Sequence, residues 1–202
     1  MNEIVPLLPA RREEGVRALT AAFSQDVMWA AILPDSAERD RVMPTMWRGV
    51  IAYCQHYGTV QTTPDVRGVA AWTKPGHAYP SLWKQLNTGF LLPRSVMLMS
   101  KLSRTRFLRD MKRIDRIHRQ IMPNPHWYLW ALGVAPEHQG QGIGGDLISP
   151  TLAQAQQMNM PCYLETETED NVDFYTKHGF SVVHEETFSD SGFRLWFMVG
   201  MP

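Results

Sequence analysis

Three glutamates, Glu165, Glu167 and Glu169, alternate along the sequence. Side chains two residues apart in a strand project from the same face, so the three carboxylates share one face if the strand extends that far. Clustered carboxylates attract a cationic amine and raise one another's pKa, which suits a general base. Glu165 is nearest to the centre of the strand and is the candidate base. The alternative is that Glu167 and Glu169 form a solvated strand end.

A second group of residues could hold a phosphate. Residues 139–145 read Gln-Gly-Gln-Gly-Ile-Gly-Gly and follow an apolar strand predicted over 127–134. Glycines let the backbone turn tightly, and several N–H groups can then converge at the start of the next helix, where an anion is favoured. A P-loop is excluded because no lysine follows these glycines. The dinucleotide-binding spacing is met by Gly140, Gly142 and Gly145, but the strand lies too late in the chain. A glycine-rich turn without a ligand is the alternative.

This loop and the segments after it resemble one superfamily. The pattern Gln-x-x-Gly-x-Gly at 139–144, after a strand that ends in Leu-Gly-Val at 132–134, is similar to the pyrophosphate loop of the GCN5-related N-acetyltransferase (GNAT) superfamily. Residues 164–166 and 171–180 look like the next strand, helix and strand of that superfamily. A narrower resemblance, to the puromycin N-acetyltransferase branch, rests on residues 126–129, 133–140, 164–166 and 171–180. About a quarter of the chain carries the likeness.

The resemblance implies acetyl-CoA as the co-substrate and assigns residues to it. Backbone groups at the end of the strand are implied to hold the pantetheine arm, with the N–H of Leu132 or Val134 polarising the acetyl carbonyl. Asn171 is implied to contact the cofactor, and it shares a helical face with Tyr175, four residues later. The implied cofactor-binding residues are Leu132, Gly133, Val134, Gln139, Gly140, Gln141, Gly142, Ile143, Gly144 and Asn171.

Acetyl transfer from a thioester to an amine needs a base for the amine and a proton for the leaving thiolate. Tyr175 matches the tyrosine that faces the cofactor sulfur in the superfamily. A tyrosine, with an ordinary pKa near ~10, stays protonated at neutral pH and can donate; the alternative is an aromatic residue that only packs its helix. Glu165 is the candidate base, directly or through water. His126 is a second candidate base, and an ordinary strand-edge histidine is the alternative.

The predicted acceptor is the primary amine of a small molecule. The branch implies resistance or detoxification chemistry, and a metabolic amine is equally compatible. Acetylation of a protein N-terminus or lysine is a second hypothesis, and it predicts an open groove instead of a roofed pocket. A third is a non-catalytic acyl-CoA-binding or regulatory module, which would be favoured if Tyr175 and Glu165 lay far from the thioester.

Composition limits the remaining possibilities. The 202 residues are 44% hydrophobic and 20% charged, as expected for one globular domain over residues 1–202. The net charge is zero, which predicts no nucleic-acid partner.

Cys54 and Cys162 lie far apart in apolar stretches, and no Cys/His spacing suggests a metal, so free thiols in a reducing compartment, the cytoplasm, are expected. No signal peptide and no membrane span are evident. The expected oligomeric state is a monomer or a homodimer.

The zero net charge conceals two opposed regions. Residues 81–119 hold ten basic residues against two acids, whereas residues 123–202 hold two basic residues against ten acids. Two helices are predicted in the basic region, over 81–91 and 93–121, with a break near Ser103. One hypothesis is a lid over the acceptor site with some arginines near the cofactor's phosphates. The alternative is a solvated basic face; a nucleic-acid face is disfavoured because interleaved aromatic residues are nearly absent.

The predicted fold class is α/β (α+β), a GNAT fold. It has a mixed, mostly antiparallel sheet of six to seven strands flanked by helices, with a helical insertion at about 76–122. The predicted strands are 4–8, 58–62, 68–73, 127–134, 162–166, 180–183 and 193–199. The other predicted helices are 13–23, 37–57 with an interruption near Pro44, one from the glycine loop to 158, and 171–178 capped by Asn171.

Overall fold

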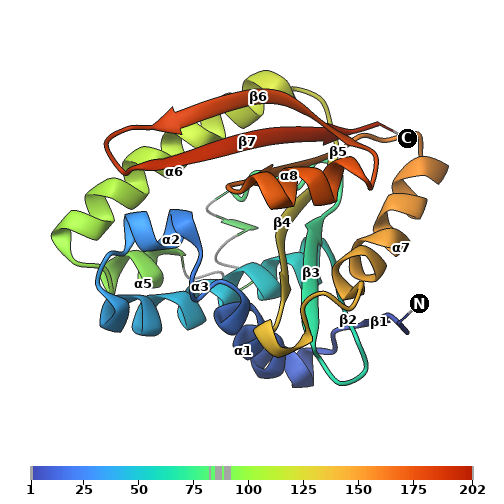
Figure 1. The fold of residues 1–202 in the computed structure, drawn as a ribbon, viewed down its shortest axis with the longest axis horizontal. Helices are drawn as coiled ribbons and strands as arrows, with labels where there is room; N and C mark the ends of the chain where they lie inside the picture. Colours follow the sequence, from blue (N-terminus) through green and yellow to red (C-terminus); the bar gives the residue numbers. More distant parts are fainter. Residues whose placement is uncertain (1, 82, 85–87, 89–91, 202) are drawn as a thin grey trace.

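The computed structural model describes residues 2–81, 83–84, 88 and 92–201. Seven strands form one sheet in the order β1-β2-β3-β4-β5-β7-β6 (Figure 1). Neighbouring strands are antiparallel except β4 and β5, which are parallel. The strands are β1 (Val5–Pro6), β2 (Gly58–Thr62), β3 (Gly68–Thr73), β4 (Trp127–Val134), β5 (Cys162–Thr166), β6 (Phe180–Phe188) and β7 (Phe193–Gly200). The predicted mixed sheet flanked by helices is therefore confirmed.

Helices cover both faces of the sheet (Figure 1). One face packs against residues of α1, α2, α3 and α6, and the other against α7 and α8. The helices are α1 (Arg12–Ala22), α2 (Val27–Ile32), α3 (Ser36–Tyr57), α5 (Leu92–Met97), α6 (Lys101–Ile121), α7 (Ile143–Gln157) and α8 (Glu169–Thr176). The helices α5 and α6 lie between β3 and β4, where the helical insertion was predicted.

The central strands are apolar on both sides because both of their faces are buried. In β3, Val69 and Ala71 belong to the core on the α1/α3 side, whereas Ala70 and Trp72 belong to the core on the α7/α8 side. Successive side chains of a strand point to opposite faces, so such a strand reads as a continuous apolar run. This pattern explains why the bounds of β3, β4 and β5 agree with those predicted from the sequence, and the predicted bounds of β2 agree as well.

A buried carboxylate ties the insertion to α3. Glu38, in the first turn of α3, is only 4% exposed. It accepts hydrogen bonds from the Ser100 backbone N–H at 2.5 Å and from the Ser103 hydroxyl at 2.7 Å. A buried carboxylate needs such donors. The start of α6 is therefore anchored over α3.

Two helix predictions need correction. The interruption expected near Pro44 does not occur, because α3 continues through this residue. The proline removes one backbone bond, but the buried face around Met43, Met46 and Trp47 holds the helix in place. The break expected near Ser103 lies earlier, at residues 98–100, because the Ser100 side chain caps α6 by accepting the Ser103 N–H. The helix predicted over 81–91 lies largely outside the described residues.

The buried face of α6 also differs from the prediction. Leu102 and Leu108, expected in the apolar face, are 56% and 51% exposed. Phe107, also expected in that face, is buried, and the other buried residues of α6 are Ser103, Asp110, Ile117 and His118. Ser103, Asp110 and His118 are polar, and they can be buried because each has a hydrogen-bond partner. Asp110, for example, accepts from Arg109 at 2.8 Å and from the hydroxyl of Ser191.

Two boundaries near the C-terminus and one near the N-terminus differ as well. The first strand is shorter than predicted, and β6 continues to Phe188 because β7 pairs with its polar half. The last small helix starts at Glu169, and its cap is Thr168, whose hydroxyl accepts the N–H of Asn171 at 3.3 Å. Asn171 is therefore inside α8 and is not its cap. No helix among the described residues is long and apolar enough to cross a membrane.

Candidate active site

A cleft of about 660 Å³ lies at the end of β4, between the loop after α1 and the start of α7. Nine of the ten predicted cofactor residues line it: Leu132, Gly133, Val134, Gln139, Gly140, Gly142, Ile143, Gly144 and Asn171. The tenth, Gln141, is exposed and is not among the lining residues. Gly145 and Phe174, which were not among the ten predicted cofactor-binding residues, also line the cleft.

The glycine loop leaves the first turn of α7 open toward this cleft. Gly140 and Gly142 have φ of +74° and +75°, a region that favours glycine, and nothing lies within 4 Å of a Cβ added at either residue. Gly142 is the N-cap of α7 and provides no side-chain cap. The side chain of Gln139 donates to the Val134 carbonyl at 3.0 Å, which fixes the loop to the end of β4. Backbone N–H groups at such a helix start are suited to an anion.

The two parallel strands separate beside the cleft. Only two residue pairs join them, Trp127 with Cys162 and Tyr128 with Tyr163. The pairing of β3 with β4 also shifts by one residue opposite Ala71 and Trp72, as at a bulge. Beyond these pairs, β4 has no partner strand on its β5 side within the part of the chain that the structure describes. A wedge therefore opens between the ends of β4 and β5.

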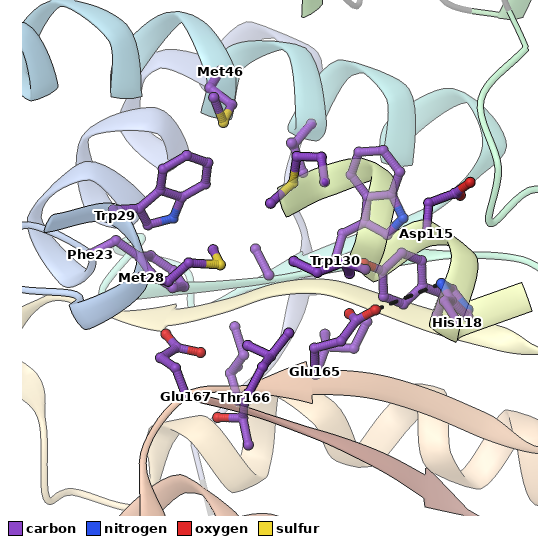
Figure 2. Close-up of a pocket in the computed structure, with 18 of the residues that line it drawn as sticks. Phe23, Met28, Trp29, Met46, Asp115, His118, Trp130, Glu165, Thr166 and Glu167 are labelled. Atoms are coloured by element: carbon purple, nitrogen blue, oxygen red, sulfur yellow. Dashed lines mark ion pairs between the residues drawn. The ribbon is translucent and has the colours of Figure 1, made fainter. Parts of the chain in front are cut away.

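A second cavity, of about 300 Å³, occupies the wedge and the space beneath α2, α3 and α6. Its walls are mainly apolar and aromatic, and Figure 2 shows Trp29, Met46, Met28 and Phe23 around one part of it. Helix α6 and residues 78–80 supply another wall. The insertion therefore lines this second cavity, whereas no basic residue of the described part of 81–119 lines the cleft beside the glycine loop.

Two of the three predicted glutamates point into this second cavity (Figure 2). The strand ends at Thr166, so Glu165 lies on β5 and Glu167 lies just beyond it, while Glu169 is on α8 and exposed. The expectation that all three share one strand face is therefore wrong. The Glu165 side chain, 11% exposed, accepts a hydrogen bond from the Tyr163 hydroxyl at 2.8 Å.

Burial changes the proton affinity of both glutamates. Burial raises the pKa of Glu165 to about 7, although the hydroxyls of Tyr163 and Tyr128 act in the opposite direction. Burial also raises the pKa of Glu167 well above its ordinary value, and the neighbouring carboxyl of Asp26 raises it further. Asp26 caps α2 by accepting the Trp29 N–H at 2.8 Å. Like-charged carboxyls in one buried place disfavour double ionisation.

The cleft and the second cavity meet at a small set of side chains. The residues that line both are Phe23, Leu132, Glu167, Asn171 and Tyr175. Burial raises the pKa of Tyr175, so its hydroxyl is protonated at neutral pH. Tyr175 and Asn171, four residues apart on α8, are therefore placed at the junction together, as their spacing predicted.

His126, the second candidate base, does not reach the cavity. Its ring is 2% exposed and lies behind His118, with the two Nε2 atoms 2.8 Å apart. His118 does line the cavity and was missed in the sequence. The signal was available: His118 follows Ile114 by four residues, so it shares the inward side of α6. Asp26 carried no comparable signal, because only the fold brings it to Glu167.

Comparisons with known proteins agree with this geometry. The model of the acetyltransferase (GNAT) family matches residues 110–180. An uncharacterized N-acetyltransferase of Schizosaccharomyces pombe is 24% identical over 174 residues, which is 83% of this chain and 70% of the relative.

Solved structures share the fold. A structure described as histone acetyltransferase HPA2 and related acetyltransferase, from Corynebacterium glutamicum, superposes with a TM-score of 0.71 at 19% identity, covering 100% of this chain and 97% of that one. A protein of the mosquito Aedes aegypti, provisionally named arylalkylamine N-acetyltransferase 7, gives 0.67 at 12% identity over 98% and 86%.

The sheet and its flanking helices are thus a GNAT fold. Together with the sequence match, the fold supports a GNAT superfamily acetyltransferase, for which acetyl-CoA is the expected co-substrate. The narrower puromycin N-acetyltransferase branch is not supported by these comparisons and stays a prediction.

Proposed function

We propose that this single-domain protein transfers the acetyl group of acetyl-CoA to the primary amine of a small molecule. The observation that carries the proposal is the junction of the two cavities at Tyr175. The cleft beside the glycine loop suits the pyrophosphate and pantetheine of the cofactor. The second cavity suits an acceptor, because it is apolar and holds carboxylates that attract an ammonium group. The two buried, unpaired cysteines favour a reducing location such as the cytoplasm.

The proposed reaction assigns one step to each group. A glutamate accepts a proton from the ammonium, directly or through a water molecule, and Glu165 is the proposed base. The free amine attacks the thioester carbonyl carbon, whose oxygen is stabilised by the N–H of Leu132 or Val134. The carbon–sulfur bond then breaks, and the Tyr175 hydroxyl gives its proton to the thiolate. The nitrogen loses its second proton as the amide forms, and this proton returns to Tyr175 through solvent. Glu167, at the junction, is placed to accept a hydrogen bond from the amine before transfer.

The second cavity favours a small molecule over a protein as the acceptor. Its volume of about 300 Å³ is at the lower end of the range for small-molecule sites. Its roof is made by α2, α3 and α6, whereas a peptide chain would need an open groove. The aromatic and methionine walls further favour an amine with an apolar body. A non-catalytic acyl-CoA-binding module is disfavoured because Tyr175 and Glu167 line both cavities.

An amine panel tests this proposal. Purified protein and acetyl-CoA are incubated with ring-bearing primary amines, short hydrophilic amines and peptides with free N-termini, and release of free thiol is measured. A buried ring adds roughly 2–3 kcal/mol of apolar burial, so ring-bearing amines are expected to exceed short hydrophilic ones by about thirty- to a hundredfold in kcat/KM. Faster acetylation of the peptides would contradict a small-molecule acceptor.

The glycine loop gives a separate prediction for cofactor binding. Gly142→Val places a side chain in the open space before α7, so it is expected to weaken acetyl-CoA binding by at least about tenfold, roughly 1.4 kcal/mol. Calorimetry measures this affinity. The matched control is Gly76→Val, because Gly76 has a similar φ of +83° and equally open surroundings but lies outside the cleft. Equal affinities for the two variants would show that the loop does not hold the cofactor.

A further inference from the structure

Four groups form a line from the surface into the second cavity. The Asn124 backbone carbonyl lies 2.7 Å from His126 Nδ1, and His126 Nε2 lies 2.8 Å from His118 Nε2. His118 Nδ1 then faces the Glu165 carboxyl, at 3.7 Å from Oε1 (Figure 2). The His118 ring stacks on Tyr163, with centroids 3.8 Å apart and planes at 16°. This stacking fixes the ring so that its two nitrogens point along the line.

The Asn124 carbonyl determines which ring nitrogen of His126, and then of His118, carries the hydrogen. A carbonyl only accepts, so His126 must carry its hydrogen on Nδ1. In a neutral imidazole the other nitrogen is then bare, so His126 Nε2 accepts, and His118 Nε2 must donate to it. His118 therefore has a bare Nδ1. Burial keeps both rings neutral, because it lowers the pKa of His118 to about 2 and also lowers that of His126.

Glu165 thus faces a lone pair where a hydrogen-bond donor would stabilise its charge. At 3.7 Å the two atoms are too far apart for an ordinary hydrogen bond, so the effect is electrostatic. The bare nitrogen repels a carboxylate oxygen and attracts the hydrogen of a carboxylic acid. The other groups that face Glu165 are the hydroxyls of Tyr163 and Tyr128, which donate to it, and Asp115, Tyr79 and Glu167, while Arg119 is engaged with Asp115 and Tyr79.

We propose that the His118–His126 pair is a positioning device that holds a bare nitrogen toward Glu165 and so favours the protonated form of this carboxyl. The device lets the proposed base keep the amine's proton near neutral pH. In this respect it rests on the proposed function, whereas the hydrogen positions themselves do not. His126 then has a role that the sequence could not show: it acts on Glu165 without touching it.

The hydrogen positions can be measured without any substrate. Nitrogen-15 NMR of the histidine rings distinguishes the two neutral forms in the intact protein. We expect His118 to carry its hydrogen on Nε2 and His126 on Nδ1, with neither ring becoming charged between about pH 5 and 8. A hydrogen on Nδ1 of His118, or a charged His118 in that range, would overturn the proposal.

Two variants at one position test the effect on Glu165. In His126→Leu, His118 loses its acceptor, and its hydrogen can move to Nδ1 and donate to Glu165. The pKa of Glu165, followed by carbon-13 NMR of its carboxyl, is expected to fall by about one unit or more. In His126→Gln, the amide oxygen can still accept from His118, so this pKa is expected to stay near that of the unmodified protein.

The activity profile supplies the link to catalysis. The acid limb of kcat/KM against pH is expected to move with the NMR pKa of Glu165 in both variants. An unchanged Glu165 pKa in a folded His126→Leu protein would refute the device. If the pKa moves but the limb does not, Glu165 is not the base, and the proposed reaction fails while the inference about the histidines stands. If His126→Leu does not fold, the ring measurement on the unmodified protein still decides.

Discussion

Tyr175→Phe is expected to lower turnover by about 10² to 10⁴, with the lower end favoured because a thiolate is a tolerable leaving group. The substitution keeps the ring, which packs against Phe180 and Phe174, and removes only the hydroxyl. Because the change touches the leaving group and not the pyrophosphate loop, acetyl-CoA affinity is expected to change little. Steady-state kinetics with an amine from the panel, together with calorimetry for acetyl-CoA, measure the two effects.

The thiol itself provides the control for this variant. Thioesters whose thiol is more acidic need less help in leaving, so the deficit of Tyr175→Phe is expected to shrink with them. A variant that turns over at the unmodified rate would make Tyr175 a structural residue. A uniform deficit with all thioesters would point to a packing defect in place of a lost proton donor.

Glu165→Gln is expected to lower turnover by a similar factor of about 10² to 10⁴, because the amide cannot accept a proton. In the unmodified protein, a base with a pKa near 7 accepts protons only when ionised, so kcat/KM is expected to rise with pH through about 7. This acid limb is expected to disappear in Glu165→Gln. The matched variant is Glu167→Gln, which removes a carboxylate from the same cavity. If Glu167→Gln loses the limb and Glu165→Gln keeps it, Glu167 is the base.

The same variant is expected to be more stable at high pH. The folded pKa of Glu165 is raised from 4.5 to about 7, so the folded state holds its proton more tightly than the unfolded chain does. Stability therefore falls as pH rises across that window, and the full cost, up to roughly 3 kcal/mol, is present above pH 7. Glu165→Gln removes this cost. Denaturant unfolding near pH 8 should show the gain, and unfolding near pH 4 should show little.

The central strands could be predicted because each is determined by a short run of neighbouring residues. Strand β4 is a continuous apolar run that ends at a proline turn, and β5 is a short apolar run bounded by proline and polar residues. Runs of this kind have few alternatives in a buried sheet. The glycine loop could be predicted equally well, because Gly140 and Gly142 adopt the left-handed backbone conformation that favours glycine.

The rest of the candidate site depends on contacts between distant parts of the chain. The inward side of α6 could not be read from its leucines, since Leu102 and Leu108 are exposed while Asp110 and His118 are buried. What decides the side is the set of hydrogen-bond partners: Ser191, 81 residues away from Asp110, and His126, which the β4 end of the following loop places beside His118. The Asp26–Glu167 pair could likewise not be predicted from the sequence, because an acidic residue at the start of a helix is already explained as an N-cap.

The early separation of β4 from β5 has a consequence for how the donor and the sheet depend on each other. Beyond Tyr128, the β5-facing edge of β4 lacks a strand partner, although β4 is central in the sheet. An extended pantetheine arm that runs from the cleft along this edge of β4, beside Leu132, Gly133 and Val134, would act as a short surrogate strand, as in recognition by strand addition. The donor would thus be a structural part of the sheet as well as a reactant. At a concentration a hundred times its dissociation constant, such a ligand adds about 2.7 kcal/mol to the free energy of unfolding. If acetyl-CoA and free CoA bind with different affinities, the stability of the protein would therefore depend on the ratio of the two in its surroundings.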